Sequence, residues 1–206
     1  MKPLVYLLPF FLLWSSCSDS AGHSETSTAP PAAEGGNGTA ASVDYKLESV
    51  PNADYQLAFR YNEKGELAEE GRMRNGQKVG TWITYHPDGE FPAKMVTYAN
   101  GNYHGPYFEF NDRGQIKLKA HYRNNLLHGD WASYRFGRTL KKAAYKDGEL
   151  HGQYLEYDMK SGKLQKEINY KEGKQHGTFR FYDLSGNVIA EYEYKNGEKI
   201  SGGMKE

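Results

Sequence analysis

The sequence predicts an all-β protein, an elongated antiparallel β-meander built from hairpin repeats of about 24 residues. The first observation behind this prediction is a two-residue turn signal, mostly Asn-Gly or Asp-Gly, that returns at a nearly constant interval. The signals begin at Asn75, Asn100, Asn124, Asp147, Glu172 and Asn196. Asn and Gly tolerate the positive φ that tight hairpin turns require. A second turn inside each unit, such as Asn111-Asp112-Arg113-Gly114 or Phe136-Gly137-Arg138, fits a type I turn closed by a left-handed glycine. The two turns leave two strand-length segments per repeat.

The second observation is the pattern within the strands. Residues 116–122 and 188–194 alternate between apolar and charged side chains, as half-buried strands do, and no window shows a convincing helical period. The first strand of each unit carries a glycine followed two residues later by an aromatic residue. These pairs are Gly80/Trp82, Gly105/Tyr107, Gly129/Trp131, Gly152/Tyr154 and Gly177/Phe179. We expect each glycine to leave room for an aromatic ring that lies over the backbone.

The second strand of five units closes on a tyrosine. These tyrosines are Tyr98, Tyr122, Tyr145, Tyr170 and Tyr194. The predicted repeat domain covers residues 44–206, with units that begin near residues 51, 75, 100, 124, 147 and 172 and a partial cap from residue 196.

The first 17 residues are typical of an export signal. Lys2 precedes an apolar run from Leu4 to Trp14, which is too short to span a bilayer. The end of this segment, Ser15-Ser16-Cys17, resembles the lipobox of bacterial lipoproteins, although Trp14 stands where an aliphatic residue is usual. The resemblance implies that Cys17 is lipidated and that the protein is anchored by lipid in the bacterial cell envelope, at the outer membrane or a periplasmic face. The alternative is ordinary secretion with a free thiol.

Residues 18–43 form a compositionally distinct segment. They are mostly Ser, Thr, Ala, Gly and Pro, which offer little apolar surface to bury. We therefore predict a disordered tether between the lipid anchor and the repeat domain.

The residue content does not favour catalysis or nucleic-acid binding. Lys plus Arg and Asp plus Glu both number 26, so no basic excess points to nucleic acid. The chain has no nucleophile elbow, P-loop, HExxH or CxxC motif. Four histidines precede the repeat glycines, namely His104, His128, His151 and His176. Equivalent positions in adjacent hairpins lie about 9 to 10 Å apart, so these histidines cannot share one metal ion, and we expect no catalytic residue, metal or cofactor.

The pattern Asn-Gly-x-x-x-Gly-x-aromatic, with a later Gly and a closing Tyr, resembles the MORN repeat variant of bacterial exported proteins. The resemblance runs from Asn75 to the end of the chain, and a degenerate copy occupies residues 55–73. It implies an elongated single-sheet meander and a non-enzymatic binding or scaffolding role with a protein partner. It also implies two rival roles, an antitoxin or immunity-type protein that neutralises a toxin, and a module that binds phospholipid headgroups.

Two columns of aromatic residues follow from the alternation. The column that we select as the candidate binding surface consists of Trp82, Tyr107, Trp131, Tyr154 and Phe179. The column on the other face consists of Tyr85, Phe110, Tyr134, Tyr157 and Tyr182. In a one-layer sheet such columns serve either cross-strand packing or contact with a partner, and the sequence leaves both open.

Overall fold

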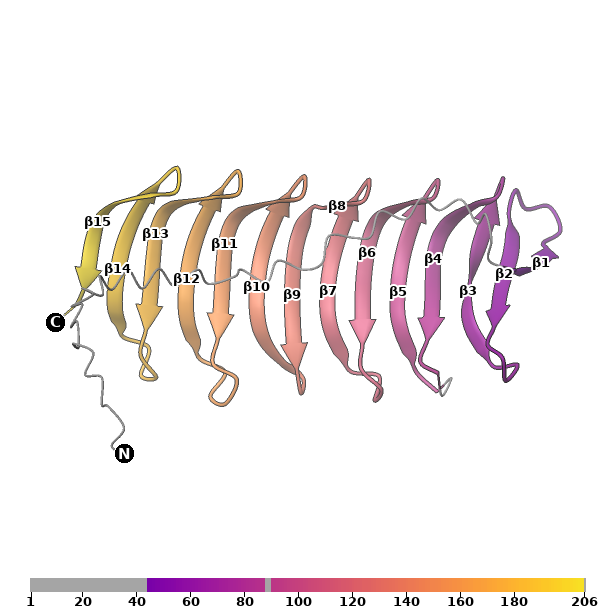
Figure 1. Ribbon diagram of the computed structural model, residues 1–206, viewed down its shortest axis with the longest axis horizontal. Coiled ribbons are helices and arrows are strands. Elements are labelled where there is room, and N and C mark those ends of the chain that lie inside the picture. Colours follow the sequence, from indigo (N-terminus) through magenta and orange to yellow (C-terminus); the bar gives the residue numbers. More distant parts are fainter. Residues whose placement is uncertain (1–43, 88–89, 206) are drawn as a thin grey trace, which may run out of the picture. The chain divides into compact units, whose positions relative to one another are not determined.

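A computed structural model describes residues 44–87 and 90–205, which form one open antiparallel sheet of 15 strands (Figure 1). The strands lie side by side in chain order, and β8 pairs only with β7. This arrangement confirms the predicted all-β meander. The predicted leader, Cys17 and the tether lie outside the described residues.

The strands are β1 (Lys46–Ser49), β2 (Gln56–Tyr61), β3 (Leu67–Arg74), β4 (Gln77–Tyr85), β5 (Pro92–Ala99), β6 (Asn102–Phe110), β7 (Ile116–Arg123), β8 (Leu126–Leu127), β9 (Gly129–Arg135), β10 (Arg138–Lys146), β11 (Glu149–Tyr157), β12 (Leu164–Lys171), β13 (Lys174–Tyr182), β14 (Val188–Lys195) and β15 (Glu198–Met204).

The recurring two-residue turns connect the hairpins at the upper edge of the sheet in Figure 1. Both residues of each turn have positive φ, for example 48° at Asn100 and 78° at Gly101. Glu172, which has no special tolerance for this region, also adopts it, with a φ of 51°. The predicted tight turns are therefore confirmed, and this edge is called the upper edge below.

Each upper turn is hydrogen-bonded to the strand that follows the preceding upper turn. The amide of Gly101 donates to the carbonyl oxygen of Lys78 at 2.9 Å, and the amide of Gly148 donates to that of Leu127 at 2.8 Å. The same bond recurs from Asn125 to Tyr103, from Gly173 to Leu150 and from Gly197 to Gln175. Each hairpin thus offers a backbone carbonyl oxygen at the same position to the next upper turn. This recurring bond explains why the turn signals return at a nearly constant interval.

The turns at the opposite, lower edge use side-chain caps. The Asn111 carboxamide oxygen accepts the amides of Arg113 and Gln115 at 3.0 and 2.9 Å, and Gly114 closes the turn at a φ of 71°. Asn62, Asp158 and Asp183 begin equivalent turns. This pattern agrees with the predicted type of turn.

One lower turn differs from the prediction. We expected a type I turn closed by glycine at residues 136–138, but Arg135 pairs directly with Arg138, so only Phe136 and Gly137 remain in the turn. Phe136 itself has a φ of 52°. The loop is two residues long, and both of them must take the left-handed conformation.

The repeat glycines do not make room for aromatic rings, contrary to our expectation. Gly80, Gly105, Gly129, Gly152 and Gly177 all have positive φ, between 67° and 113°. A Cβ built at Gly129 would approach only the Cβ of His121, at 3.9 Å, and one at Gly152 only that of Ala144, at 3.3 Å. Near each of them the pairing with the preceding strand is irregular, as between Val96 and Tyr98. These glycines are needed because β-bulges require this backbone conformation.

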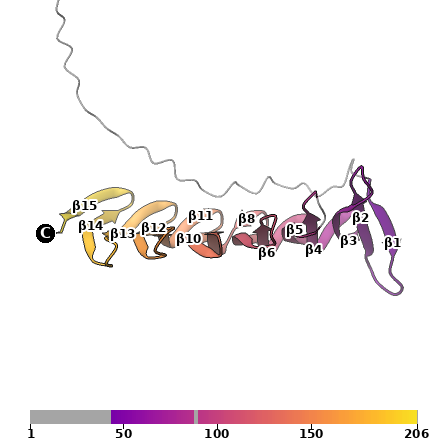
Figure 2. The ribbon, with the colours of Figure 1, turned by 90° about the horizontal axis from the view of Figure 1, so that it is seen from below.

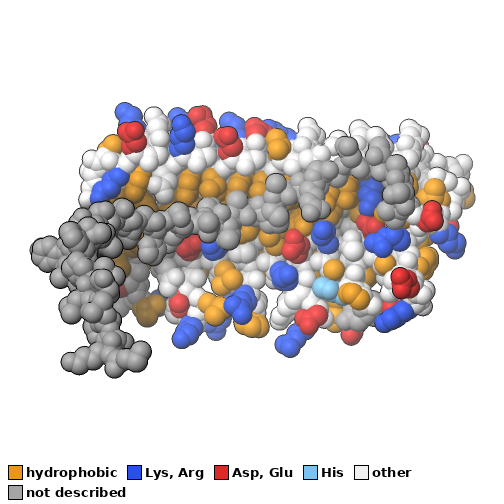
Figure 3. Space-filling view, viewed as in Figure 1, with side chains coloured by type: hydrophobic (Ala, Val, Ile, Leu, Met, Phe, Trp, Pro, Cys, Tyr) orange, Lys and Arg blue, Asp and Glu red, His pale blue; other side chains and the backbone are white. Residues whose placement is uncertain are grey.

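The core of the sheet is a row of side chains that crosses the strands on one face, here called the core face. Large residues of one strand pair with small or aliphatic residues of the next, as Trp82 does with Val96 and Tyr107 with Ala120. The strands are curved, as the views along and across the sheet show (Figures 1 and 2). Hydrophobic side chains run as a band across successive strands in the space-filling view (Figure 3). Large-to-small alternation lets a single sheet bury a continuous apolar row.

Candidate binding faces of the sheet

The five residues of the predicted binding column all lie in this core row. Trp82 is 2% exposed, Tyr107 7% and Trp131 6%, whereas Tyr154 and Phe179 are partly buried. Trp131 pairs with Ala143, and Phe179 pairs with Ile168 on one side. A binding role for this column stays a prediction, but only Tyr154 and Phe179 keep an appreciable part of the ring accessible to a partner.

The closing tyrosines extend the core. The rings of Tyr98 and Tyr103 meet edge to face with centroids 5.0 Å apart, and those of Tyr103 and Tyr122 do so at 5.5 Å. Burial raises the pKa of Tyr122 and of Tyr145 to about 12. These phenols therefore stay neutral at physiological pH and act as packing groups.

A row of charges lies beside the core row on the same face. Glu156 contacts Lys141 at 2.8 Å and Lys166 at 3.3 Å, and it accepts a hydrogen bond of 2.6 Å from the Tyr154 hydroxyl. Burial by itself would raise the pKa of Glu156, but the hydrogen bonds from Lys141 and Tyr154 and the charge of Lys166 outweigh burial and lower the pKa to about 2. The Tyr107 hydroxyl donates to Glu109 in the same way, at 2.6 Å.

The N-terminal end of the core row holds a lysine inside a set of aromatic rings. The Lys78 ammonium lies 4.0 Å from the Trp82 ring centroid and 5.5 Å from those of Tyr45 and Tyr98. Glu69 accepts from Lys78 at 2.6 Å and from the Tyr45 hydroxyl at 2.7 Å. Burial lowers the pKa of Lys78 although Glu69 opposes the shift. Such rings attract cations, but here the protein's own lysine fills the space, so the cluster caps the core.

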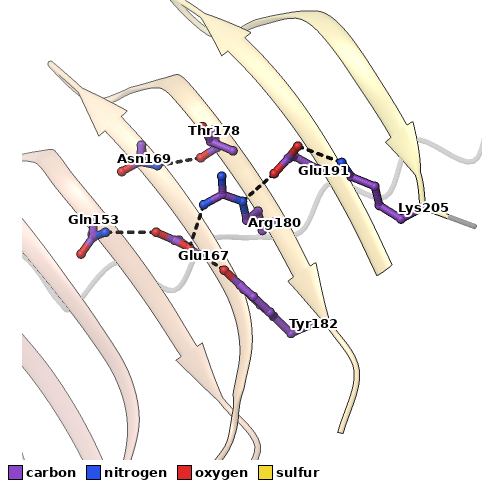
Figure 4. A network of polar contacts seen from close by, with 8 residues as sticks. All are labelled: Gln153, Glu167, Asn169, Thr178, Arg180, Tyr182, Glu191 and Lys205. Carbon is purple, nitrogen blue, oxygen red and sulfur yellow. Dashed lines mark hydrogen bonds and ion pairs between the residues drawn. The ribbon is translucent and has the colours of Figure 1, made fainter. Parts of the chain in front are cut away.

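The opposite face carries a polar network in its C-terminal half (Figure 4). Glu167 accepts hydrogen bonds from Gln153 at 3.0 Å and from the Tyr182 hydroxyl at 2.7 Å. Arg180 bridges Glu167 at 3.6 Å and Glu191 at 2.6 Å. Lys205, the residue after β15, contacts Glu191 at 3.1 Å, so the contacts extend from β11 to the end of the sheet. Partly exposed pairs of this kind set cross-strand register more than they add stability.

The N-terminal half of the opposite face contains three apolar side chains in line, between Glu70 on β3 and Lys119 on β7. Ile83 pairs with Met95, and Met95 pairs with Phe108, so the three side chains lie in line across β4, β5 and β6. All three are partly buried, and the Phe108 ring stacks on Phe110 with centroids 6.3 Å apart. This row, Ile83, Met95 and Phe108, is called the apolar row below.

The second aromatic column of the sequence analysis is also partly buried on the described strands. Two of its members, Tyr85 and Tyr182, donate hydrogen bonds to glutamates on neighbouring strands, and burial raises the pKa of Tyr85 to about 12. These tyrosines tie strands together, which the sequence spacing alone did not indicate.

The four repeat histidines lie along the upper edge, where three contact the next turn. His104 Nδ1 lies 3.2 Å from the Asn124 side-chain oxygen, and His128 Nδ1 lies 3.4 Å from an Asp147 carboxylate oxygen. The amide of Asn196 donates to His176 Nδ1 at 3.5 Å. Across residues 44–87 and 90–205, no three His, Cys, Asp or Glu side chains gather as metal ligands would. The same part of the chain contains no helix long and apolar enough to cross a membrane.

Two of the hairpin units match a known protein family. Comparison with curated proteins gives no match. The family described as MORN repeat variant matches residues 103–124 and 175–196. Both segments run from the first strand of one hairpin to the following upper turn, β6 to β7 and β13 to β14. The chain therefore carries MORN-variant repeats at these two positions, within a meander whose other hairpins are joined by the same type of upper turn.

Proposed function

We propose that this protein is a non-catalytic binding module of the bacterial cell envelope, held at a membrane by a lipid on Cys17, and that it binds a protein partner through the apolar row. The observation that supports this role is the row itself. Ile83, Met95 and Phe108 form an apolar stripe across three strands, and none of them belongs to the buried core of the described residues.

The other surfaces of the sheet support the same choice. The core row is occupied by cross-strand packing, and the C-terminal half of the opposite face is occupied by its own ion pairs. A partner strand or helix on the apolar row would gain hydrophobic contact without breaking an internal contact. Fully burying side chains of this size contributes about 1.5 to 3 kcal/mol each, and less here because they are already half-buried.

A photo-crosslinking amino acid placed at Met95 of the full chain, in cells, tests the binding face. We expect one dominant adduct with an envelope protein. The matched control is the same amino acid at Arg180, which lies on the same face in the polar half of the sheet. No adduct from position 95, or the same adducts from both positions, would contradict the proposal.

The anchor has its own test. Cys17→Ser should release the protein from the membrane fraction, and a variant that resists a high-salt wash would contradict lipidation. The antitoxin alternative predicts a different outcome, because a form without residues 1–17 would remain in the cytoplasm and should still protect cells from a toxin. The headgroup alternative predicts that vesicles compete with the adduct at position 95.

A further inference from the structure

The apolar row continues, on the same face, into two lysines that flank an alanine. Phe108 pairs with Lys119 on β7, which pairs in turn with Ala132 on β9. On its other side Ala132 pairs with Lys142 on β10. The apolar row and these three residues therefore lie in one line across the sheet, which is called the cross-strand line below. The line changes from apolar to basic between two neighbouring strands.

A hollow of about 290 Å³ lies over Ala132, where a short side chain stands among long ones. Ala132 is 8% exposed, whereas Lys119 and Lys142 on either side of it are exposed. Asp130 and Tyr134, which precede and follow Ala132 on the same face of β9, also line the hollow. The recess formed by Lys119, Asp130, Ala132, Tyr134 and Lys142 is called the lysine hollow below.

The lysine hollow carries charge that the protein itself does not neutralise. Within residues 44–87 and 90–205, neither Lys119 nor Lys142 forms an ion pair with a carboxylate. The Lys142 ammonium lies 5.9 Å from the centroid of the Tyr157 ring, a contact that leaves its charge in place. Asp130 contributes one negative charge against the two lysines, so the lysine hollow is net positive.

Charged residues farther along the same line are neutralised, in contrast to these lysines. Beyond Leu155, the line runs through Glu167, Arg180 and Glu191. Arg180 lies 3.6 Å from Glu167 and 2.6 Å from Glu191, so these charges have partners within the sheet (Figure 4). The unpaired lysines next to the apolar row are therefore not a general feature of this face.

The spacing of the cross-strand line fits an α-helix that lies along the sheet. Neighbouring strands are about 4.8 Å apart, and an α-helix brings the same face back once per turn, about 5.4 Å farther on. Such a helix places one side chain over each strand for several turns. An extended segment in the same direction would place same-face side chains about 6.6 to 6.8 Å apart and would lose this match.

The charges of the line determine which residues such a helix needs and where. From Ile83 to the centre of the lysine hollow the line crosses four strand spacings, about 19 Å, which is between three and four helical turns. Carboxylates three and four turns after the first apolar side chain therefore reach Lys119 and Lys142. Glu70 precedes Ile83 in the line and would repel an acidic residue at that end.

We propose that the partner segment of the apolar row is an amphipathic α-helix, with apolar side chains on the apolar row and acidic side chains in the lysine hollow. This inference rests on the proposed function, because it specifies the chemistry of the partner that the apolar row binds. Docking of the apolar face of a helix is a common mode of peptide recognition. Here the ion pairs fix the position and direction of the helix, since apolar contact alone would allow it to slide by one strand.

Two synthetic peptides test the position of the acidic residues. Both are helical and about 20 residues long, with leucines on three successive turns and a pair of glutamates. In the first peptide the glutamates lie on the leucine face, three and four turns after the first leucine. In the second peptide they lie on the opposite face. Fluorescence anisotropy measures the binding of each labelled peptide to the full chain with Cys17→Ser.

We expect the first peptide to bind several-fold more tightly than the second, with a difference that shrinks as salt is added. Lys119→Gln/Lys142→Gln should remove the difference. The matched control is Lys171→Gln/Lys195→Gln, which replaces exposed lysines at the ends of β12 and β14 and should preserve it. Equal binding of the two peptides by the chain with its native lysines would overturn the inference, and so would binding of neither.

Charge reversal at the same lysines separates this inference from the proposed function. With the photo-crosslinking amino acid at Met95 of the full chain in cells, Lys119→Glu/Lys142→Glu should abolish the dominant adduct, whereas Lys171→Glu/Lys195→Glu should leave it. An adduct that persists in Lys119→Glu/Lys142→Glu would overturn the acidic helix and leave the apolar row as the binding site. Absence of the adduct even with the native lysines would contradict the proposed function, and the inference with it.

Discussion

The indole ring of Trp82 lies directly over Gly71 on the neighbouring strand, and its Nε1 donates a hydrogen bond to the Arg72 carbonyl oxygen at 3.1 Å. A Cβ at Gly71 would overlap the ring. Trp82 is 2% exposed and has no room to move outward without losing its contacts with Tyr45 and Tyr98. The close approach of ring and backbone that we expected at the repeat glycines therefore occurs at a different glycine.

This contact predicts that Gly71→Ala lowers the free energy of unfolding by roughly 1 to 3 kcal/mol, because the ring must leave its rotamer or the strands must separate. Urea unfolding followed by far-UV circular dichroism measures the change. Gly203→Ala is the control, since its φ is not positive and a Cβ there meets nothing within 4 Å. Similar losses at both positions would show that the packing of Trp82 on Gly71 is unimportant.

Substitutions of Gly129 test whether the backbone conformation of the β-bulge is the reason for the glycine. Its φ is 89°, and space around it is open, so the cost of a side chain there comes from the backbone. Gly129→Ala should lower the unfolding free energy by about 1 to 2 kcal/mol, and Gly129→Asn should cost less, because asparagine tolerates positive φ better than alanine. If alanine and asparagine are equally harmful, crowding and not backbone conformation explains the glycine.

Glu156 makes stability depend on pH in the acid range. Its pKa is lowered from an ordinary 4.5 to about 2 in the folded protein. The unfolded chain therefore takes up this proton first, so the stabilisation is present above about pH 4.5 and is lost as the pH falls toward 2. After allowance for solvent screening, we expect a loss on the order of 1 to 2 kcal/mol.

The measurement is the urea midpoint at several pH values between 6 and about 2.5. Glu156→Gln should be less stable at pH 6 and should show a flatter dependence over this window. Glu193→Gln, a partly buried glutamate on the opposite face, is the control and should keep the wild-type slope. Parallel curves for Glu156→Gln and the wild type would show that the charge row does not contribute.

Much of the fold could be predicted because its signals are local. The residue types of a turn such as Asn100-Gly101 indicate the positive φ that the turn needs. The repetition of such turns at a fixed interval predicts a meander of hairpins. The role of glycine could not be predicted, since positive φ at Gly129 and close contact at Gly71 look alike in a sequence. Gly71 lies in the degenerate first unit, where no pattern marks it.

The candidate sites were harder to predict because they depend on which strands meet. The sequence shows that Trp82, Tyr107 and Trp131 share a face but not that their neighbours bury them. A usable signal was missed, since a small or aliphatic residue stands two places before the closing tyrosine at Val96, Ala120, Ala143 and Ile168. In the cluster that caps the core, Tyr45 lies before the first repeat unit and Lys78 lies within the repeats. The spacing of the repeats could not predict this contact.

Whether the core row is exposed decides most directly where this sheet can bind a partner. Quenching of tryptophan fluorescence measures that exposure. In a full chain with Trp14→Phe, excitation at the red edge of the absorption band selects tryptophan, and the tryptophan emission comes only from Trp82 and Trp131. Because they are 2% and 6% exposed, we expect acrylamide to quench the native protein several-fold less than the same chain in urea. Native quenching as strong as that of the unfolded chain would mean that the row is an open surface, and would contradict a packed core.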